Sequence, residues 1–269
     1  LVTAGEWMPI QFYANDGQKL RNVTDSRSLP PLRGWWYSLQ TGDFNHDGHP
    51  DLIAGNLGLN HTYTTSENSR FGVYAADFTG SRTTDIVLTQ EVDGTEYPFF
   101  GFATLGRAIY TVGLKFPTYE SFSDASVRQV FNSSQLNQAV HYQADTFASV
   151  YLQNNGDGTF TSFPLPNLAQ ISPIIGIIAH DVDGDGNLDL IVAGNLYDTE
   201  PNVPRADAGN GLWLKGDGHG GFTAVPPFES GFLAPWDVKD LALIDTPRGK
   251  AVLVANNGDS LQAFTIRAR

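Results

Sequence analysis

The sequence predicts an all-β fold built from repeated units of short antiparallel strands. Three observations support this prediction: an acidic loop recurs before apolar strands, a strand–turn–strand pattern lies between the loops, and turn-forming residues are spread along the chain. The 269 residues include 28 glycines and 15 prolines, as expected where many short strands are joined by tight turns. This length fits one large all-β domain, so residues 1–269 are interpreted as a single domain.

The clearest repeat is a nine-residue acidic loop followed by an apolar strand. It occurs at residues 43–51, before Leu52-Ile53-Ala54-Gly55-Asn56-Leu57, and again at residues 181–189, before Leu190-Ile191-Val192-Ala193-Gly194-Asn195-Leu196. Weaker copies occur at residues 77–85 and 245–250, each also followed by apolar residues. Residues 1–6 resemble the strand after such a loop, so the first repeat is expected to be cut in its middle.

A second repeated element supplies the remaining strands. Residues 151–160 and 213–222 each read as a strand, a turn of Gly, Asp and Asn, and a strand ending in an aromatic residue, which is a hairpin signature. An acidic loop with its two strands and this hairpin give four strands per unit. Four-stranded units in series are the blades of a β-propeller, complete or partial.

The acidic loops are unevenly spaced, and the longest gap lies between the loops at residues 77–85 and 181–189. Within it, residues 131–140 lack strand alternation. We therefore expect an insertion at about residues 98–144, with short helices, lying over one face of the fold.

The two intact loops predict calcium sites. Oxygen side chains at positions one, three, five and nine of a tight loop converge, position seven offers its carbonyl, and calcium prefers such oxygen cages. The predicted ligands are Asp43, Asn45, Asp47, the carbonyl of His49, and Asp51 in the first loop, and Asp181, Asp183, Asp185, the carbonyl of Asn187, and Asp189 in the second. An apolar strand follows each loop where an EF-hand would have a helix. An Asp-rich hairpin turn without metal is the alternative.

The loop at residues 77–85 predicts a weaker site. Its candidate ligands are Asp77, Thr79, Ser81, the carbonyl of Thr83, and Asp85. Only two of these side chains are acidic, and charge count tunes calcium affinity. A turn held by side-chain hydrogen bonds, without metal, is the alternative there.

Charge and composition exclude several other partners. The net charge of −13 and the absence of any basic run argue against nucleic acid, which needs a basic surface. The chain has no cysteine, which excludes disulfides and thiolate metal sites. No apolar run approaches the roughly 20 residues that a membrane-spanning helix needs.

The loops and the strands after them resemble FG-GAP/VCBS repeats. Repeats of this kind build the integrin α-subunit propeller and many bacterial exported proteins, including those related to the ASPIC/UnbV group. The resemblance implies a propeller with calcium in its blade hairpins. The chain holds only four to five blades' worth of sequence, against the seven typical of the family, and both ends are expected to fall within a blade.

The leading functional hypothesis is a secreted, cell-surface or periplasmic module that recognises a protein or a glycan, alone or within a larger assembly. The alternative is a polysaccharide-active enzyme, a lyase or hydrolase, built on a propeller. No catalytic residue is nominated, since the sequence lacks the common hydrolase and metalloprotease motifs. Loops present ligand sites on rigid scaffolds, so residues 197–210 together with residues 56–63 are one candidate for a binding face; a solvated connection between strands is the alternative.

Overall fold

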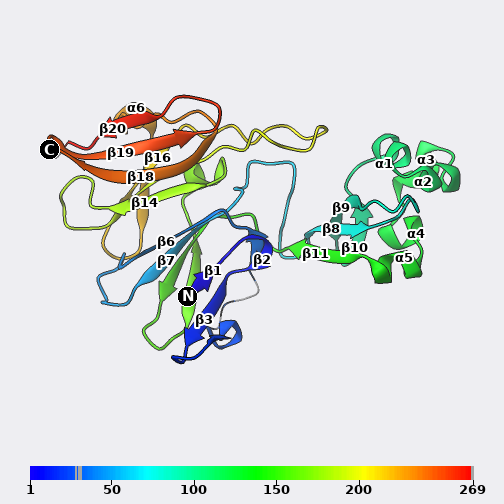
Figure 1. Ribbon diagram of the computed structural model, residues 1–269, viewed down its shortest axis with the longest axis horizontal. Helices are drawn as coiled ribbons and strands as arrows, with labels where there is room; N and C mark the ends of the chain where they lie inside the picture. The colour runs from blue at the N-terminus through cyan, green and yellow to red at the C-terminus, as the bar shows by residue number, and fades with distance from the viewer. Residues whose placement is uncertain (28, 30–31, 268–269) are drawn as a thin grey trace. The chain divides into compact units, whose positions relative to one another are not determined.

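The computed structural model describes residues 1–27, 29 and 32–267 and divides the chain into two compact units (Figure 1). Unit 1 consists of Leu1–Thr62 and Phe147–Arg269, and unit 2 consists of Tyr63–Thr146. Strands dominate unit 1, unit 2 combines a sheet with short helices, and every ladder between the described strands is antiparallel.

The predicted four-stranded unit is present twice in unit 1. The first sheet has the order β13-β12-β7-β6 and the second the order β14-β15-β16-β17. Their strands are β6 (Ser38–Gly42), β7 (Asp51–Gly55), β12 (Val150–Asn154), β13 (Phe160–Pro164), β14 (Gly176–His180), β15 (Asp189–Ala193), β16 (Leu212–Gly216) and β17 (Phe222–Val225). In each sheet an intact acidic loop joins the first two strands, and the Gly/Asp/Asn turn joins the last two.

Smaller sheets flank these two in unit 1. They are β1-β3-β4, β2-β5 and β18-β19-β20. Their strands are β1 (Val2–Thr3), β2 (Glu6–Pro9), β3 (Gln11–Asn15), β4 (Leu20–Asn22), β5 (Arg33–Trp35), β18 (Val238–Thr246), β19 (Gly249–Asn256) and β20 (Gln262–Thr265). Three short helices connect the sheets of unit 1: η1 (Thr24–Arg27), η2 (Asn167–Gln170) and α6 (Pro227–Ser230).

The expected loop at residues 245–250 is wrong. Asp245 pairs with Lys250 and Thr246 with Gly249 in the β18-β19 ladder, so a two-residue turn closes this hairpin. Gly249 has φ 107°, a left-handed conformation that glycine adopts at little cost. The tight turn leaves no room for a nine-residue loop.

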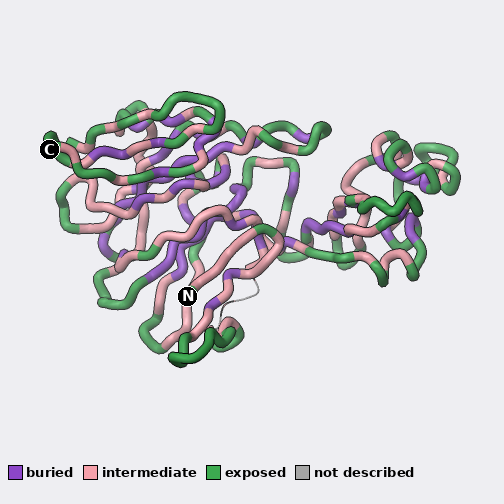
Figure 2. The backbone as a smooth tube through the Cα atoms, viewed as in Figure 1, coloured by how far each residue is buried: buried purple, intermediate pink, exposed green. Residues whose placement is uncertain are grey.

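The sheets of unit 1 pack face to face in chain order, as consecutive blades do. One core joins the N-terminal strands to the first four-stranded sheet through Phe12, Trp36 and Leu152. A second core lies between the two four-stranded sheets, and a third joins β14 and β15 to β18 and β19. Figure 2 shows buried residues concentrated along these strands and exposed residues along the connecting loops.

Unit 2 is inserted between the second and third strands of the first four-stranded sheet. It contains a sheet of order β10-β9-β8-β11 and five short helices. Its elements are β8 (Phe71–Ala76), β9 (Asp85–Val92), β10 (Thr95–Pro98), α1 (Phe102–Ala108), α2 (Tyr110–Lys115), α3 (Tyr119–Ser123), α4 (Val127–Val130), α5 (Ser133–Gln138) and β11 (Val140–Ala144). The weaker repeat at residues 77–85 joins β8 to β9, so it lies inside unit 2.

The helices of unit 2 cover one part of its sheet. Tyr74 and Val87 from the sheet share a core with Leu105, Val112 and other apolar residues of the helices. Capping boxes at Thr118 and Asn132 satisfy the first backbone N–H groups of α3 and α5. Among the helices in the described ranges, none combines the length and the apolar character needed to cross a bilayer.

A polar network lies on the same face of the unit 2 sheet and centres on Glu96. Its carboxylate accepts hydrogen bonds from the Tyr74 hydroxyl (2.6 Å) and the Thr89 hydroxyl (3.2 Å), and it pairs with Nε2 of His141 (2.9 Å). Gly72 leaves the space, since a Cβ there would lie 2.4 Å from the Thr89 hydroxyl. Burial alone would raise the pKa of Glu96, but the bonds from His141 and Tyr74 outweigh burial and lower it.

We expect Glu96 to make the stability of unit 2 depend on pH. Because its pKa is lower in the folded chain, the stabilisation is complete above the unfolded value of about 4.3 and is lost as pH falls through the folded value. Glu96→Gln should lower the free energy of unfolding by about 1–2 kcal/mol at neutral pH, since a neutral amide accepts weaker hydrogen bonds. Denaturant unfolding should show this difference shrinking as the pH falls from the unfolded pKa of the carboxyl group toward its lower folded pKa. Exposed Glu120 on α3 provides the control, and equal effects of Glu120→Gln and Glu96→Gln would contradict the prediction.

Candidate functional site

The three nine-residue loops share one backbone conformation. Positions four and six are left-handed in every loop: His46 and Gly48, Gly80 and Arg82, Gly184 and Gly186. The first aspartate of each loop accepts a hydrogen bond from the N–H of position six, at 3.1, 2.8 and 3.0 Å respectively. The loop at residues 77–85 therefore keeps the shape of the intact loops although it has fewer acids.

Position five closes the second half of each loop. Asp47 and Asp185 each accept the N–H of position seven, from His49 at 2.8 Å and from Asn187 at 2.9 Å. These backbone hydrogen bonds are the main reason that the pKa of Asp47 and of Asp185 is lowered. Both carboxylates are therefore ionised at neutral pH, as a cation ligand must be.

The ninth aspartate of each intact loop is a buried anchor. Asp51 has no exposed surface. Its Oδ2 accepts the N–H of Phe44 (3.1 Å) and the Tyr151 hydroxyl (2.9 Å), and its Oδ1 accepts the N–H of Asn154 (2.8 Å). One carboxylate thus ties the loop to the end of β12, the third strand of the sheet.

Asp189 repeats this arrangement in the second sheet. It is fully buried, its Oδ2 accepts the N–H of Val182 (2.9 Å), and its Oδ1 accepts the N–H of Gly216 at the end of β16 (2.8 Å). Burial raises the pKa of Asp189, and the two backbone hydrogen bonds only partly offset this effect. In the third loop, Asp85 accepts the N–H groups of Phe78 and Thr79. The sequence pattern predicted ligands at these positions and did not reveal the anchoring role.

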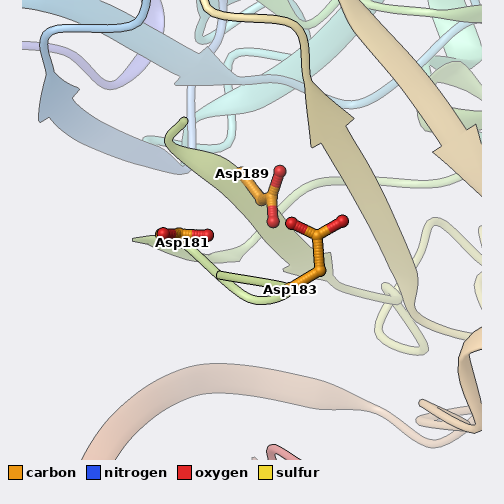
Figure 3. A group of neighbouring side chains, drawn as sticks. All are labelled: Asp181, Asp183 and Asp189. Atoms are coloured by element: carbon orange, nitrogen blue, oxygen red, sulfur yellow. The ribbon is translucent and has the colours of Figure 1, made fainter. Parts of the chain in front are cut away.

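Three carboxylates of the second loop converge. One oxygen each from Asp181, Asp183 and Asp189 lies within 4.8 Å of the other two (Figure 3). Two oxygens bound to one calcium ion lie up to about 5 Å apart, because each bond is about 2.3–2.6 Å long. The donor set and spacing therefore fit a hard divalent cation. Among the described residues this is the one such group of three acidic, histidine or cysteine side chains.

A lysine lies beside these carboxylates. Nζ of Lys215, on β16, pairs with Asp183 and lies 3.0 Å from Oδ2 of Asp185. Hydrogen bonds to Asp183 and then Asp185 raise the pKa of Lys215, so it is charged at neutral pH. The strand registers place Gln153 of β12 at the equivalent position of the first sheet. The sequences of the two hairpins already show this difference, but only the structure shows that Lys215 lies beside the acidic loop.

The first loop is arranged differently from the second. Asp43, Asp47 and Asp51 do not form a group of three converging carboxylates. Asn45 donates its side-chain amide to Oδ2 of Asp47 at 2.9 Å. His46 Nε2 lies 3.0 Å from Oδ1 of Asn187, so the two intact loops meet at the same end of the sheets.

The third loop is closed by its own hydroxyl groups. The Thr79 hydroxyl donates to Oγ of Ser81 at 2.9 Å, and Ser81 and Thr83 share a hydrogen bond of 2.6 Å. The lowered pKa of Asp77 comes mainly from the N–H of Arg82. These contacts favour the interpretation as a turn held by side-chain hydrogen bonds.

The opposite ends of the same strands carry long connections. Parts of the segments at residues 56–62 and 197–210 lie beside each other in unit 1. Leu59 to Thr62 and Pro204 and Arg205 line a cavity of about 360 Å³. Acidic loops and long connections therefore lie at opposite ends of the four-stranded sheets.

We expect the buried ninth aspartate to stabilise unit 1 without any metal. Asp51→Ala should lower the free energy of unfolding by about 3 kcal/mol, because it leaves three buried donors without their acceptor. Asp198→Ala, at an exposed aspartate, is the control and should change it little. Denaturant unfolding in EDTA measures both, and equal small effects would show that Asp51 acts through a metal alone.

Two segments of the chain match known repeat families. Residues 35–67 match the FG-GAP repeat, and residues 140–192 match the FG-GAP-like repeat. The two segments contain the two intact acidic loops. No curated protein matches the chain. The narrower resemblance to VCBS repeats and to the ASPIC/UnbV group stays a prediction.

Proposed function

Because the chain belongs to the FG-GAP repeat family, we propose that it is a recognition module for other proteins, stiffened by calcium in its acidic loops. The observation that carries this proposal is that the two matched repeats overlap two face-packed, four-stranded sheets. Repeats of this family often take part in protein interactions. A rigid stack of sheets also suits this role, since it presents long connections at one end.

The proposed calcium sites differ in strength. The second loop supplies the converging oxygens of Asp181, Asp183 and Asp189. The first loop supplies one carboxylate fewer, because Asn45 stands at the position of Asp183. The third loop has two acids and is already closed by hydroxyl hydrogen bonds. We therefore rank the second loop above the first, and the first above the third.

The proposed role of the metal is structural. Asp183 and its neighbours crowd negative charge into a short loop, and a divalent cation would relieve the repulsion between them. Extracellular modules bind calcium with Kd values of about 10⁻⁴–10⁻³ M. Proteins with FG-GAP repeats are often extracellular or surface-exposed, so we propose a secreted, cell-surface or periplasmic location.

Calcium should raise the stability of unit 1. A ligand that binds only the folded chain stabilises it by about 2.7 kcal/mol per site when its free concentration is about 100 times Kd. Thermal unfolding of the metal-free protein, titrated with calcium into the millimolar range, measures this effect. An unchanged melting temperature after exhaustive EDTA treatment would remove the main support for calcium.

Single substitutions in the loops distinguish the three proposed calcium sites. Asp183→Ala and Asp47→Ala should each lose one bound calcium ion in atomic emission of dialysed protein, and Ser81→Ala should lose none, because each lost carboxylate removes a ligand and much of the attraction. Lys215→Gln should tighten binding at the second loop, since it removes a competing cation. Equal losses in all three loop variants would contradict the ranking.

Protein recognition can be separated from the other hypotheses by direct binding. The immobilised chain should bind a component of the exported-protein fraction of its source saturably, and heat-denatured chain is the control. A glycan array and a polysaccharide digestion assay run in parallel. Binding to glycans alone would favour glycan recognition, and shortening of a polysaccharide would favour the enzyme; either result without protein binding would overturn the proposal.

A further inference from the structure

Two cavities of unit 1 lie at the end of the sheets opposite the acidic loops, and their lining segments are neighbours. The larger, of about 420 Å³, is lined by residues that include Ile171, Leu212 and Phe228. The smaller is the 360 Å³ cavity lined by Leu59 to Thr62, Pro204 and Arg205. Both cavities use the same two walls, and we call them together the end groove.

The first wall joins the segment at residues 58–62 to the segment at residues 170–172. Leu59 donates its N–H to the carbonyl of Gln170 at 2.6 Å, and the Asn60 side chain donates to the carbonyl of Ile171 at 3.2 Å. Leu59 and Asn60 line the smaller cavity, whereas Ile171 lines the larger. The wall is therefore continuous between the two cavities.

The second wall is the connection between β15 and β16. Pro204 and Arg205 line the smaller cavity, and the segment at residues 209–211 lines the larger. Fully buried Asn195 fixes this connection, because its side chain exchanges hydrogen bonds with the backbone of Gly209 and donates to the carbonyl of Trp236. The groove is thus formed before any ligand binds.

The larger half of the end groove is apolar and open. Phe228 is 85 % exposed, Leu233 is 50 % exposed and Leu168 is 45 % exposed. Pro226 and Pro227 precede Phe228 and fix the start of α6, which ends at Gly231 in the left-handed conformation. Large apolar side chains held in this way at a cavity mark a surface that binds other molecules.

The smaller half is polar and carries a cation. The Arg205 guanidinium lies 5.0 Å from the centre of the Tyr197 ring, which holds it in place. Arg205 makes no salt bridge with the described acids, although Asp198, Glu200 and Asp207 lie on the same connection. Burial lowers the pKa of His61, so its imidazole is neutral at neutral pH. One fixed guanidinium beside amide and hydroxyl groups suits a single carboxylate.

We propose that the end groove binds an extended peptide segment of a partner protein, in which a bulky apolar residue lies next to an aspartate or glutamate. The apolar side chain occupies the half around Phe228, and the carboxylate pairs with Arg205. The local charge at Arg205 supports a carboxylate at this point of the groove, because this guanidinium makes no salt bridge with the described acids. A free fatty acid has the same two chemical parts, but the open apolar half would leave much of an acyl chain in water, whereas small-ligand sites bury most of the ligand. This inference rests on the proposed protein-recognition function and names its site.

A library of random heptapeptides displayed on phage tests the inference. Selection on the folded chain should enrich peptides with Phe, Leu or Trp next to Asp or Glu. Selection on Arg205→Glu should lose the acidic preference, and selection on Phe228→Asp should lose the apolar one. Both side chains are exposed, so the variants should fold, which thermal unfolding checks. No enrichment on the folded chain, or the same peptides on all three proteins, would overturn the inference.

Affinity measurements on one enriched peptide complete the test. Fluorescence polarisation should show binding at least about tenfold weaker for Arg205→Glu and for Phe228→Asp. The matched controls Arg248→Glu and Leu261→Asp, at exposed positions outside the groove, should bind normally. Displacement by micromolar dodecanoate would favour a fatty acid and overturn the peptide. Binding of exported protein that persists in Arg205→Glu and Phe228→Asp would refute the groove while leaving the recognition function intact.

Discussion

A buried carboxylate holds each four-stranded sheet of unit 1 to its acidic loop. Asp51 and Asp189 are fully buried, and an unpaired charge in such a place would be very unfavourable. Backbone N–H groups from the loop and from the third strand donate hydrogen bonds to each carboxylate. The same contacts fix the loop against a strand that is distant in sequence. The other loop acids are then free to face solvent and a cation.

This anchor explains why the two ends of the sheets differ. At the anchored end the loops have a fixed length and a shared pair of left-handed positions. At the opposite end the connections vary freely: unit 2 follows β7 there, and the long connection after β15 lies there too. Asn56 and Asn195, both buried, hold the start of these connections by side-chain hydrogen bonds to the backbone. These two long connections thus lie at the end that carries the proposed peptide groove.

Local patterns revealed the loops and strands of unit 1, because ligand spacing and strand alternation are both short-range signals. The pairing of β7 with β12 was not predictable in this way, since about a hundred residues separate Asp51 from Tyr151 and Asn154. The extent of unit 2 was hidden for a related reason: residues 77–85 carry a weaker copy of the acidic loop, so they were grouped with the repeats of unit 1. The loop wrongly expected at Asp245 followed from a single aspartate before an apolar strand, where pairing with Lys250 continues the ladder instead.

The two intact loops differ in one side-chain ligand and in one neighbouring residue. Asn45 stands in the first loop where the second has Asp183, so the first loop offers one carboxylate fewer. On the third strand, Lys215 neutralises part of the charge of the second loop, and Gln153 at the same register leaves the charge of the first loop uncompensated. A cation that bound the second loop would displace an ammonium group but find converged oxygens. A cation that bound the first loop would meet no ammonium group on β12 but one carboxylate fewer. Ligand count alone therefore does not rank these sites. Gln153 and Lys215, which come one residue before the anchored ends of β12 and β16, have to be compared as well.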